Sequence, residues 1–445
     1  MELEDVLRLL AELDDDERVA EILREQQPYD VAELIPDLPA EARLRIMRSL
    51  PPAFAAETLE HLTPELQYSI LDHLGEDAAT AVANELSSDA VADLALSVHP
   101  RQAERLLALL PPDYREVVRK LTTYPESSAG GRMTVDYISV RQTWTQDQVM
   151  QHIRKVAKDV ETINYLYVVD QDGRLTGVTS LRDLILAQPG DRVQDFMSTR
   201  LIAVTATADQ EEAARELANY DFLAVPVTDP AGRLVGIITW DDVMDVIEEE
   251  ATEDIQRMGG TEPLGEPYME VNLFTLYRKR VGWLLLLFLA QSFTGTILKH
   301  FEGFLSQVVA LTFFIPLLID TGGNSGAQAS TTVIRAMAVG DVTPIDFLRV
   351  VWREARLGLI LGLTMAAATL LRAFLLGSGV ALGLTVAVTI LAIVLVGSTV
   401  GAALPIIGRR LGFDPAVLSA PLITTIADTL GLLIYFWAAR MILGL

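Results

Sequence analysis

The chain has 445 residues, with 60 Asp and Glu against 35 Lys and Arg, and it contains no cysteine. Its length exceeds that of a typical single domain, and the lack of cysteine excludes disulfides, thiolate nucleophiles and iron–sulfur clusters. The excess of acids argues against a nucleic-acid partner, because a phosphate backbone attracts basic surfaces. Residues 1–261 hold 50 acids against 23 Lys and Arg, whereas residues 262–445 hold 10 against 12. A strongly acidic half is therefore joined to a nearly neutral, apolar half.

Leucine recurs every twelve residues near the start of the chain, from Leu38 to Leu86, and a proline follows several of these leucines. Proline fits the first turn of a helix. The pattern therefore predicts short helices stacked into an all-α superhelical domain over residues 1–130. Alone, such a domain indicates an interaction surface and no chemistry.

An internal repeat lies within residues 131–254. The stretch YVVDQDGRLTGVTSLRDLI (167–185) aligns with VPVTDPAGRLVGIITWDDVM (225–244). Each copy predicts a strand, a glycine turn, a second strand and a helix capped by Ser180 or Thr239. The repeat resembles the paired CBS module, an α/β tandem that often binds adenine nucleotides. The resemblance implies ATP contacts from four residues, with an empty, purely structural cleft as the open alternative: Tyr165, Arg182, Asp183 and Phe222.

The second copy is unusually acidic, with fourteen acids against two arginines between Asp209 and Asp254. Asp242, Asp245 and Glu249 fall on one face of the predicted helix, where like charges repel. Repulsion is relieved either by solvation or by a bound cation, and hard divalent cations prefer carboxylate and water oxygens. We interpret this segment as cation-binding.

Five apolar segments predict a transmembrane domain of five helices in residues 281–445, since about 20 apolar residues span a bilayer. The segments are 281–298, 304–334, 357–376, 380–407 and 416–439. Residues 255–280, just before them, are expected to form a connecting helix. The placement of Lys and Arg predicts a cytoplasmic N-terminal half and a C-terminus outside.

The second apolar segment is interrupted by Gly-Gly-Asn-Ser-Gly at 322–326. A broken helix normally lines a cavity, because lipid cannot satisfy freed backbone groups. We therefore predict a pathway element here. The alternative is that the glycines let two helices pack closely.

Asp428 is the only charge in the last apolar segment. A carboxylate at the centre of a span costs roughly 2.5–3.5 kcal/mol, so it normally faces a partner, an ion or a water-filled path. The arginines that could pair with it, Arg372, Arg409 and Arg440, stand near segment ends. The pattern favours an ion or a path.

In this order, the segments resemble the MgtE family of magnesium channels over essentially the whole chain. The residues that carry the resemblance are the Gly322–Gln328 stretch, Phe413-Asp414-Pro415-Ala416 and Ala427-Asp428-Thr429-Leu430-Gly431. The resemblance implies a homodimer in a bacterial plasma membrane, with Asp428 of both chains at a pore for hydrated Mg²⁺. It also implies pore-lining Gly322, Gly323, Asn324, Gln328 and Ala420.

The resemblance further implies that cytosolic Mg²⁺ closes the pore by bridging acidic faces. The expected regulatory residues are Asp209, Glu211, Asp221, Asp242, Asp245, Glu250, Glu253 and Asp254, with Glu57, Asp89 and Asp93 on the N-terminal domain. Ala327 and Ala420 depart from the family pattern, where Asn is common, and this leaves selectivity open.

Two other function classes compete with a channel. A carrier coupled to H⁺ or Na⁺ would also need Asp428. A membrane metalloprotease is disfavoured, because none of the five histidines lies deep in an apolar segment. We therefore expect no enzymatic role.

Overall fold

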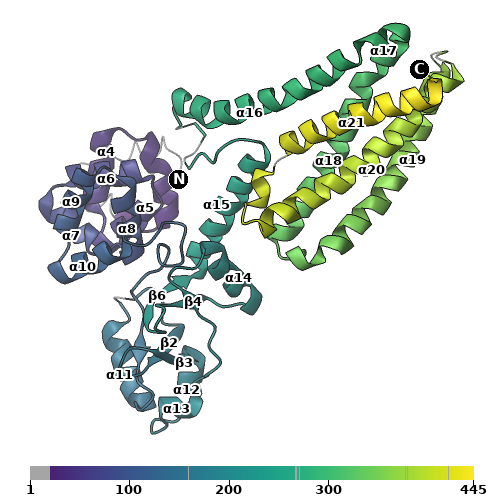
Figure 1. The fold of residues 1–445 in the computed structure, drawn as a ribbon. Helices are drawn as coiled ribbons and strands as arrows, with labels where there is room; N and C mark the ends of the chain where they lie inside the picture. Colours follow the sequence, from purple (N-terminus) through teal and green to yellow (C-terminus); the bar gives the residue numbers. More distant parts are fainter. Residues whose placement is uncertain are drawn as a thin grey trace. The chain divides into compact units, whose positions relative to one another are not determined.

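The computed structural model describes residues 21–158, 160–265, 268–269, 271–375, 377, 379–418 and 420–444. The predicted N-terminal domain begins at residue 1, so its first 20 residues lie outside this set. The chain divides into two compact units, Met1–Glu248 and Glu249–Leu445. Each unit is described by itself, with the labels of Figure 1.

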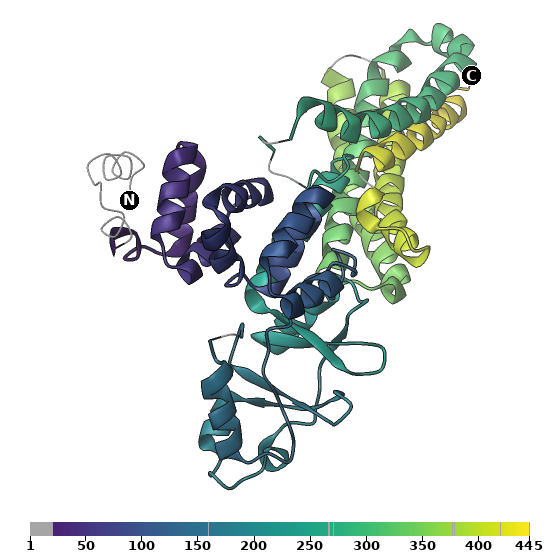
Figure 2. The same cartoon turned by 90° about the vertical axis from the view of Figure 1, so that its left-hand side faces the viewer.

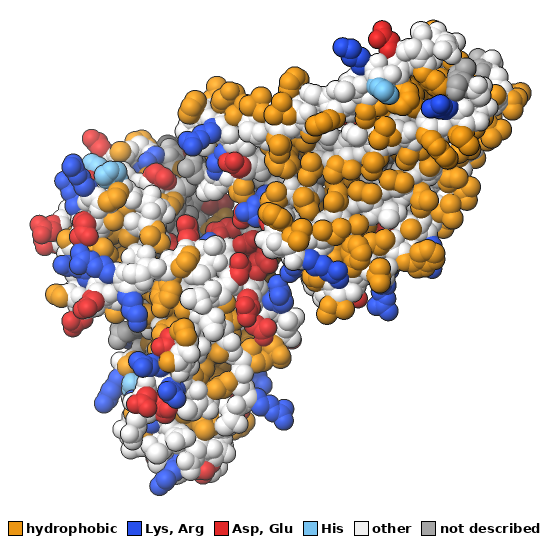
Figure 3. Space-filling view, in the orientation of Figure 1, with side chains coloured by type: hydrophobic (Ala, Val, Ile, Leu, Met, Phe, Trp, Pro, Cys, Tyr) orange, Lys and Arg blue, Asp and Glu red, His pale blue; other side chains and the backbone are white. Residues whose placement is uncertain are grey.

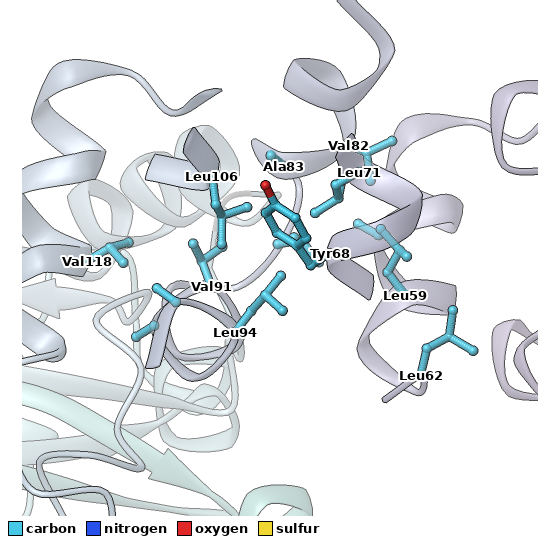
Figure 4. Close-up of a cluster of buried hydrophobic side chains, with 14 of the residues drawn as sticks. Leu59, Leu62, Tyr68, Leu71, Val82, Ala83, Val91, Leu94, Leu106 and Val118 are labelled. Carbon is cyan, nitrogen blue, oxygen red and sulfur yellow. The ribbon is translucent and has the colours of Figure 1, made fainter. Parts of the chain in front are cut away.

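The first unit opens with short stacked helices, as the leucine pattern predicts (Figure 1). Leu38, Leu50, Leu62, Leu74 and Leu86 are all buried, with 2–7% of each side chain exposed. Proline occupies the first turn of five of these helices. Leucines from neighbouring helices meet around Tyr68 in one core (Figure 4). The helices are α3 (Pro28–Leu34), α4 (Ala40–Ser49), α5 (Pro52–Glu60), α6 (Pro64–Leu74), α7 (Glu76–Ala83), α8 (Ser88–Ser97), α9 (Pro100–Leu109) and α10 (Pro112–Leu121).

Two small sheets follow, and their identical topology confirms the internal repeat (Figure 2). In each sheet the first strand pairs parallel with the second, and the second pairs antiparallel with the third. The strands are β1 (Ser139–Val140), β2 (Tyr165–Val169), β3 (Leu175–Ser180), β4 (Val204–Thr205), β5 (Ala224–Thr228) and β6 (Leu234–Thr239). The accompanying helices are α11 (Gln146–Val156), α12 (Leu181–Leu186), α13 (Val193–Phe196), α14 (Gln210–Tyr220) and α15 (Trp240–Met258).

The helical domain and the second CBS copy share one hydrophobic core. Buried Val91 and Val118 of the helices belong to the same cluster as Val225, Ile238 and Val243 of the second copy. Burial of this apolar surface fixes the acidic residues at the junction in place. The first copy has a separate core around β1, β2 and α11.

The second unit is a bundle of long helices in which α20 contacts α18, α19 and α21. Hydrophobic side chains cover most of its face in Figure 3. Four helical segments are long and apolar enough to cross a membrane among the described residues: Leu273–His300, Pro344–Leu375, Val380–Arg410 and Pro421–Leu443. The helices are α16 (Leu273–His300), α17 (Glu302–Gln307), α18 (Ile315–Ala338), α19 (Phe347–Leu375), α20 (Val380–Arg410) and α21 (Ala420–Leu443).

The prediction of a helix broken at residues 322–326 is wrong. α18 runs without interruption from Ile315 to Ala338, and the irregular backbone precedes it, in a 3-10 helix at Val309–Phe314. The alternative reading of the glycines holds instead. A Cβ on Gly397 would stand 2.7 Å from the carbonyl oxygen of Gly322, and one on Gly401 would collide with the carbonyl of Gly326. Small residues four apart on both helices let the two backbones touch.

α18 also explains why only four segments qualify as spans by composition. Its middle is rich in Gly, Asn, Ser, Thr and Gln, although it packs against both α20 and α21. Five transmembrane helices therefore remain a prediction. The expected connecting helix at 255–280 is likewise not one element, because α15 ends at Met258 and α16 begins at Leu273. The described residues between Gly259 and Asn272 form no helix.

Candidate functional site

Asp428 lies in the middle of α21 and is 4% exposed. Its Oδ2 accepts a hydrogen bond of 3.3 Å from the side-chain amide Nε2 of Gln291, on α16. Its Oδ1 is buried and has no hydrogen-bond partner among the described residues. The arginine partner considered from the sequence is not found, because the ion pairs of the described residues do not include Asp428. One carboxylate oxygen is thus hydrogen-bonded to Gln291, and the other is buried without a partner among the described residues.

Gln291 was missed by the sequence interpretation. The signal was present, since Gln291 is the one long polar side chain in the apolar segment 281–298. The sequence places Gln291 within the first apolar segment. It does not show that the fold brings Gln291 to Asp428, which is 137 residues away in the chain.

The five predicted pore-lining residues separate into three environments. Gly322 and Gly323 are buried, where a Cβ would meet Ile393 of α20 or Thr424 of α21. Asn324 and Gln328 are exposed on another face of α18. Ala420 begins α21. The glycines therefore serve helix packing in this unit, and the polar face of α18 is carried by Asn324 and Gln328.

A hollow of about 530 Å³ lies between α16 and α21. On α16 it is lined by Leu284, Leu287, Phe288 and Gln291, and on α21 by Pro421, Thr424 and Thr425. Both sets have the spacing of a single helical face. Gln291 is the residue that this hollow shares with the Asp428 carboxylate.

A second group of acids lies at the end of α15. Arg257 forms ion pairs with Glu253, one turn before it, and with Asp414, just before the short 3-10 helix Pro415–Val417. Asp414 also accepts a hydrogen bond of 2.8 Å from the backbone N–H of Ala416. Burial raises the pKa of Glu253 above its usual range, and the charge of Arg257 opposes that rise. The predicted regulatory residue Glu253 is thus ion-paired with the Arg257 guanidinium of the same helix.

The pKa of Asp254, the residue next to Glu253, is also raised. Burial and then the charge of Asp414 raise the pKa of Asp254, and Arg257 again opposes the rise. Glu250, one turn earlier on α15, adds a further negative charge to both neighbours. The structure therefore brings Glu250, Glu253 and Asp254, three predicted regulatory acids, together with Asp414. Asp414 belongs to the Phe413-Asp414-Pro415-Ala416 motif but is not a predicted regulatory residue.

A third acidic group lies at the junction of the helical domain and the CBS copies. Burial raises the pKa of Asp89 to about 7, and the charges of Glu161, Asp93 and Glu60 add to this. Burial also raises the pKa of Asp242, with Asp89 as the strongest neighbouring charge. Asp89 Oδ1 is buried without a hydrogen-bond partner among the described residues. The structure therefore brings together the predicted residues Asp89, Asp93 and Asp242.

Hydrogen bonds at the start of α8 fix the geometry of this junction. The backbone N–H of Ser87 donates to Glu60 over 3.1 Å, and that of Ser88 donates to Asp136 over 3.2 Å. Acceptors of this kind satisfy the unpaired N–H groups of a helix N-terminus and suit its positive dipole end. The hydroxyl of Ser88, which is fully buried, lies 3.1 Å from that of Thr134. Glu60, Asp136 and Glu161 are not among the predicted site residues, because each looks like an ordinary surface acid in the sequence.

The remaining predicted regulatory acids do not join one centre. Asp209 caps α14 by accepting the N–H of Glu211, and Glu211 forms an ion pair with Arg215 at 3.7 Å. Asp221 ends α14 with a positive φ of 52°. Glu57 and Asp245 are exposed. Among the described residues, no group of three or more His, Asp or Glu side chains could hold a metal ion by itself.

The predicted nucleotide contacts come from both CBS copies. Tyr165 of β2 and Phe222, which follows α14, have ring centroids 6.2 Å apart in an edge-to-face arrangement. Arg182 and Asp183 are exposed in the first turn of α12. One carboxylate oxygen of Asp183 accepts the hydroxyl of Ser180 at 2.6 Å, and Asp242 accepts Thr239 in the same way in the second copy. In both copies the repeated acid therefore bonds back to the hydroxyl residue that begins the helix, as in a capping box.

Comparisons with known families cover most of the chain. The MgtE intracellular N domain matches residues 26–127, and the CBS domain matches residues 129–190 and 193–249. The MgtE divalent cation transporter family matches residues 315–438.

Whole-chain relatives give the same result. The chain is 44% identical to the magnesium transporter MgtE of Thermus thermophilus, covering 96% of each protein. It is 34% identical to the magnesium transporter MgtE of Bacillus subtilis, covering 94% of this chain and 92% of that protein.

Two crystal structures resemble the first unit. One is the cytosolic domain of the Mg²⁺ channel MgtE in complex with ATP, with a TM-score of 0.53 and 43% identity, covering 55% of this chain and all of that one. The other is the soluble part of a magnesium transporter, with a TM-score of 0.53 and 31% identity, covering 56% of this chain and all of that one. Fold order, family matches and whole-chain identity agree, and the chain therefore belongs to the MgtE family of magnesium transporters.

Proposed function

We propose that this protein is a Mg²⁺-selective channel for magnesium uptake across the plasma membrane, closed by Mg²⁺ on the cytosolic side. The observation that carries the proposal is the carboxylate of Asp428, buried within a membrane helix with Oδ1 unpaired among the described residues. An ionised carboxylate is costly there unless a cation or water compensates it.

The selectivity proposal follows from the chemistry of Mg²⁺. This ion loses its water reluctantly and is usually held by one or two carboxylates through its hydration shell. In a homodimer with a two-fold axis along the pore, two copies of Asp428 would meet the same ion. Two nearby carboxylates in a low-dielectric site favour a divalent cation, since otherwise one of them would take up a proton.

Regulation is assigned to the acids outside the membrane helices. The group around Asp89 and Asp242 and the group around Glu253 and Asp254 both concentrate unfavourable negative charge. Ions that bind the compact arrangement better shift the population toward it. High cytosolic Mg²⁺ would thus favour a closed pore, and low Mg²⁺ would let the acids repel and the pore open.

Orientation and nucleotide binding complete the proposal. The distribution of Lys and Arg favours a cytoplasmic N-terminus and an outside C-terminus. ATP binding at Tyr165, Arg182, Asp183 and Phe222 is supported by the relative whose cytosolic domain was crystallised with ATP.

The direct test is complementation of a bacterial strain that cannot take up Mg²⁺. The wild-type chain is expected to restore growth at low Mg²⁺, and Asp428→Ala is expected to fail at equal membrane abundance. Equal rescue by both chains would remove Asp428 from the ion path. Single-channel recording separates a channel from an ion-coupled carrier, because a carrier's stepwise turnover gives no resolvable unitary current.

Regulation and assembly have separate tests. Mg²⁺ at millimolar order is expected to protect residues 245–280 from protease in the full-length protein, and equal cleavage with and without Mg²⁺ would contradict the gating mechanism. The molar mass of the detergent-solubilised protein, corrected for detergent, is expected to be twice that of the 48.8 kDa chain.

A further inference from the structure

Three arginines form one exposed row at the start of α19. Arg349, Arg353 and Arg356 are spaced four and three residues apart, which places them on one face of the helix, and all three are exposed. The opposite face packs against α20, where a Cβ on Gly358 would stand 3.1 Å from the Cβ of Ser398. The three arginines, named the basic stripe below, therefore point away from α20, the helix on which α19 packs.

Nearby acids neutralise the basic stripe only in part. The ion pairs of the described residues include it once, between Arg349 Nη1 and Asp346 Oδ1 at 3.9 Å, and the Arg349 side chain is 87% exposed. A pair of this kind contributes little. Glu354 follows Arg353 in the chain and attracts it, but Glu354 is half-buried on the side of α19 that carries Gly358. The group keeps a net positive charge, and its arginines repel one another at this spacing.

The arginines at the end of α20 give a contrast at the same end of the bundle. Arg409 donates a hydrogen bond of 3.1 Å to the backbone carbonyl of Met337, and Arg410 donates to that of Pro344. The guanidinium carbon of Arg410 also lies 5.2 Å from the ring centroid of Phe347. These two arginines hold the chain that leads into α19. The hydrogen bonds of the described residues do not include the basic stripe, so its donors are open to a ligand from outside.

Trp352 lies on the same face as the basic stripe and indicates its depth in the bilayer. Trp352 is 65% exposed. The guanidinium carbon of Arg356 lies 6.0 Å from its ring centroid, at the outer limit of cation–π attraction. Tryptophan is enriched at the level of the lipid headgroups, where its ring meets apolar chains and its N–H meets water. This ring therefore places the basic stripe at the headgroup level.

The apolar part of α19 gives the same depth. No charged residue lies between Arg356 and Arg372, near the other end of the helix. At about 1.5 Å of rise per residue, these two arginines stand ~24 Å apart along the axis. The hydrocarbon core of a bilayer is ~30 Å thick, and long basic side chains at its edges extend toward water. In Figure 3, Lys and Arg side chains gather at the lower end of the bundle, below a hydrophobic face.

The face that carries the basic stripe continues as an apolar surface. Ile360, Leu363 and Phe374 follow on the same face at helical spacing, and all three are exposed. Along this face of α19, positive groups are followed by apolar side chains. A phospholipid has the matching order from its headgroup to the ends of its chains.

We propose that the basic stripe binds the headgroup of an anionic phospholipid, whose acyl chains lie along Ile360 and Leu363. A guanidinium matches a phosphate with two parallel hydrogen bonds. A free phosphate would use only the first part of this face. A zwitterionic headgroup carries its own ammonium group, which the arginines repel. The lipid site is separate from ion permeation, so it stands or falls independently of the proposed channel function.

The test is native mass spectrometry of the full-length protein in a neutral detergent, with apparent Kd values taken from lipid titrations. The probes are dioleoyl phosphatidylglycerol, which is anionic, and dioleoyl phosphatidylcholine, which has the same chains and no net charge. The wild type is expected to bind its tightest phosphatidylglycerol with a Kd about tenfold lower than that for phosphatidylcholine. Equal Kd values for the two lipids would overturn the proposal from the wild type alone, however the variants fold.

A double variant, Arg353→Gln with Arg356→Gln, removes two charges and keeps a high helix propensity. Its Kd for phosphatidylglycerol is expected to rise about tenfold, toward that for phosphatidylcholine. Arg372→Gln is the matched control, because Arg372 is exposed near the other end of the same helix and has no basic neighbour within two turns. It should keep the wild-type preference. An unchanged Kd in the double variant, or an equal rise in the control, would overturn the site.

Two other occupants would give different results. Inorganic phosphate at millimolar order is not expected to displace phosphatidylglycerol, because it has no chains to lie along Ile360 and Leu363. Displacement would reduce the site to an anion site and overturn the lipid assignment. If the basic stripe instead contacted a second copy of the chain, the lipid-free double variant would have a lower oligomeric mass than the wild type. The two masses are expected to correspond to the same number of chains, and a lower number would also overturn the proposal.

Discussion

Arg257 forms ion pairs with Asp414 and with Glu253, its neighbour one turn earlier on α15. One guanidinium therefore joins the end of α15 to the loop that precedes α21, the helix that carries Asp428. A Mg²⁺ ion bound by these two carboxylates would have to displace that guanidinium. Arg257 is in this sense an internal competitor of the regulatory ion.

Replacement of Arg257 by Ala should therefore make the connecting region depend more strongly on Mg²⁺. In this variant without Mg²⁺, Glu253 and Asp414 lack the cation that pairs with them, and their repulsion from each other and from Asp254 should speed cleavage of residues 245–280 several-fold. With millimolar Mg²⁺ the cleavage rate should return to the wild-type level. Limited proteolysis of the full-length protein measures both, with Arg257→Lys as the variant that keeps the charge. Equal cleavage of Arg257→Ala and the wild type without Mg²⁺ would argue against the competitor role.

Tight packing of α18 on α20 predicts a large effect from one methyl group. In Gly401→Ala the new Cβ would collide with the backbone carbonyl of Gly326, which cannot rotate away. Overpacking of this kind costs about 1–3 kcal/mol, so the thermal midpoint in detergent should fall by about 5 °C. Gly295→Ala on α16 is the control, because no heavy atom lies within 4 Å of its Cβ position. Similar midpoints for the two variants would show that the helices are not in backbone contact.

The acidic junction predicts a pH dependence for the isolated cytosolic unit, whose counterparts in relatives have been crystallised alone. The pKa of Asp89 is raised from 3.8 to about 7, first by burial. Between these values the folded state holds a proton that the unfolded chain has released. Its contribution to stability is therefore fully present below pH 4, declines as pH rises toward 7, and is lost above 7.

Asp89→Asn should then raise the melting temperature at pH 8 in the absence of divalent ions, with the difference shrinking at pH 5. Differential scanning fluorimetry in EDTA measures this. Asp77→Asn replaces an exposed acid, also in the first turn of a helix, and serves as the control. A stabilisation that is the same at both pH values would show that the Asp89 carboxylate is not responsible.

Nucleotide binding can be tested with the internal repeat as its own control. Asp183 and Asp242 accept hydrogen bonds from the residues that begin their helices in the same way, but only Asp183 lies on the helix assigned to ATP. Asp183→Asn is expected to weaken ATP binding to the cytosolic unit by about tenfold, as for loss of one charge-assisted hydrogen bond. Asp242→Asn should leave it unchanged in calorimetric titrations in EDTA. Equal losses in both variants would place the nucleotide elsewhere.

Local patterns in the sequence were sufficient for most of the architecture. The twelve-residue leucine period identifies buried positions such as Leu38 and Leu74, because a leucine at or just after the end of each short helix packs into the core. The aligned copies at 167–185 and 225–244 predict two sheets with the same strand order, because the strands follow the pattern of each copy. Both features depend on residues near one another in the chain.

The errors arise where distant segments meet. The glycines of α18 look the same in sequence whether they break a helix or pack against another one, and only Gly397 and Gly401 on α20 decide between these. Gln291 looks like a tolerated polar residue until α16 is placed beside α21. Glu161 is an unremarkable acid until burial and the charges of Asp242 and Asp241 raise its pKa to about 7.

The backbone contact between α18 and α20 has a consequence for how the membrane unit can change shape. At Gly326, Gly397 and Gly401 the two helices meet backbone to backbone, and nearby the Ser325 and Ser398 hydroxyls are hydrogen-bonded across the same contact. We expect α18 and α20 to move together as one rigid body. Any widening around Asp428 is then expected to come from α16, which is largely exposed along its length and packs on α21, where Gln291 donates to Asp428.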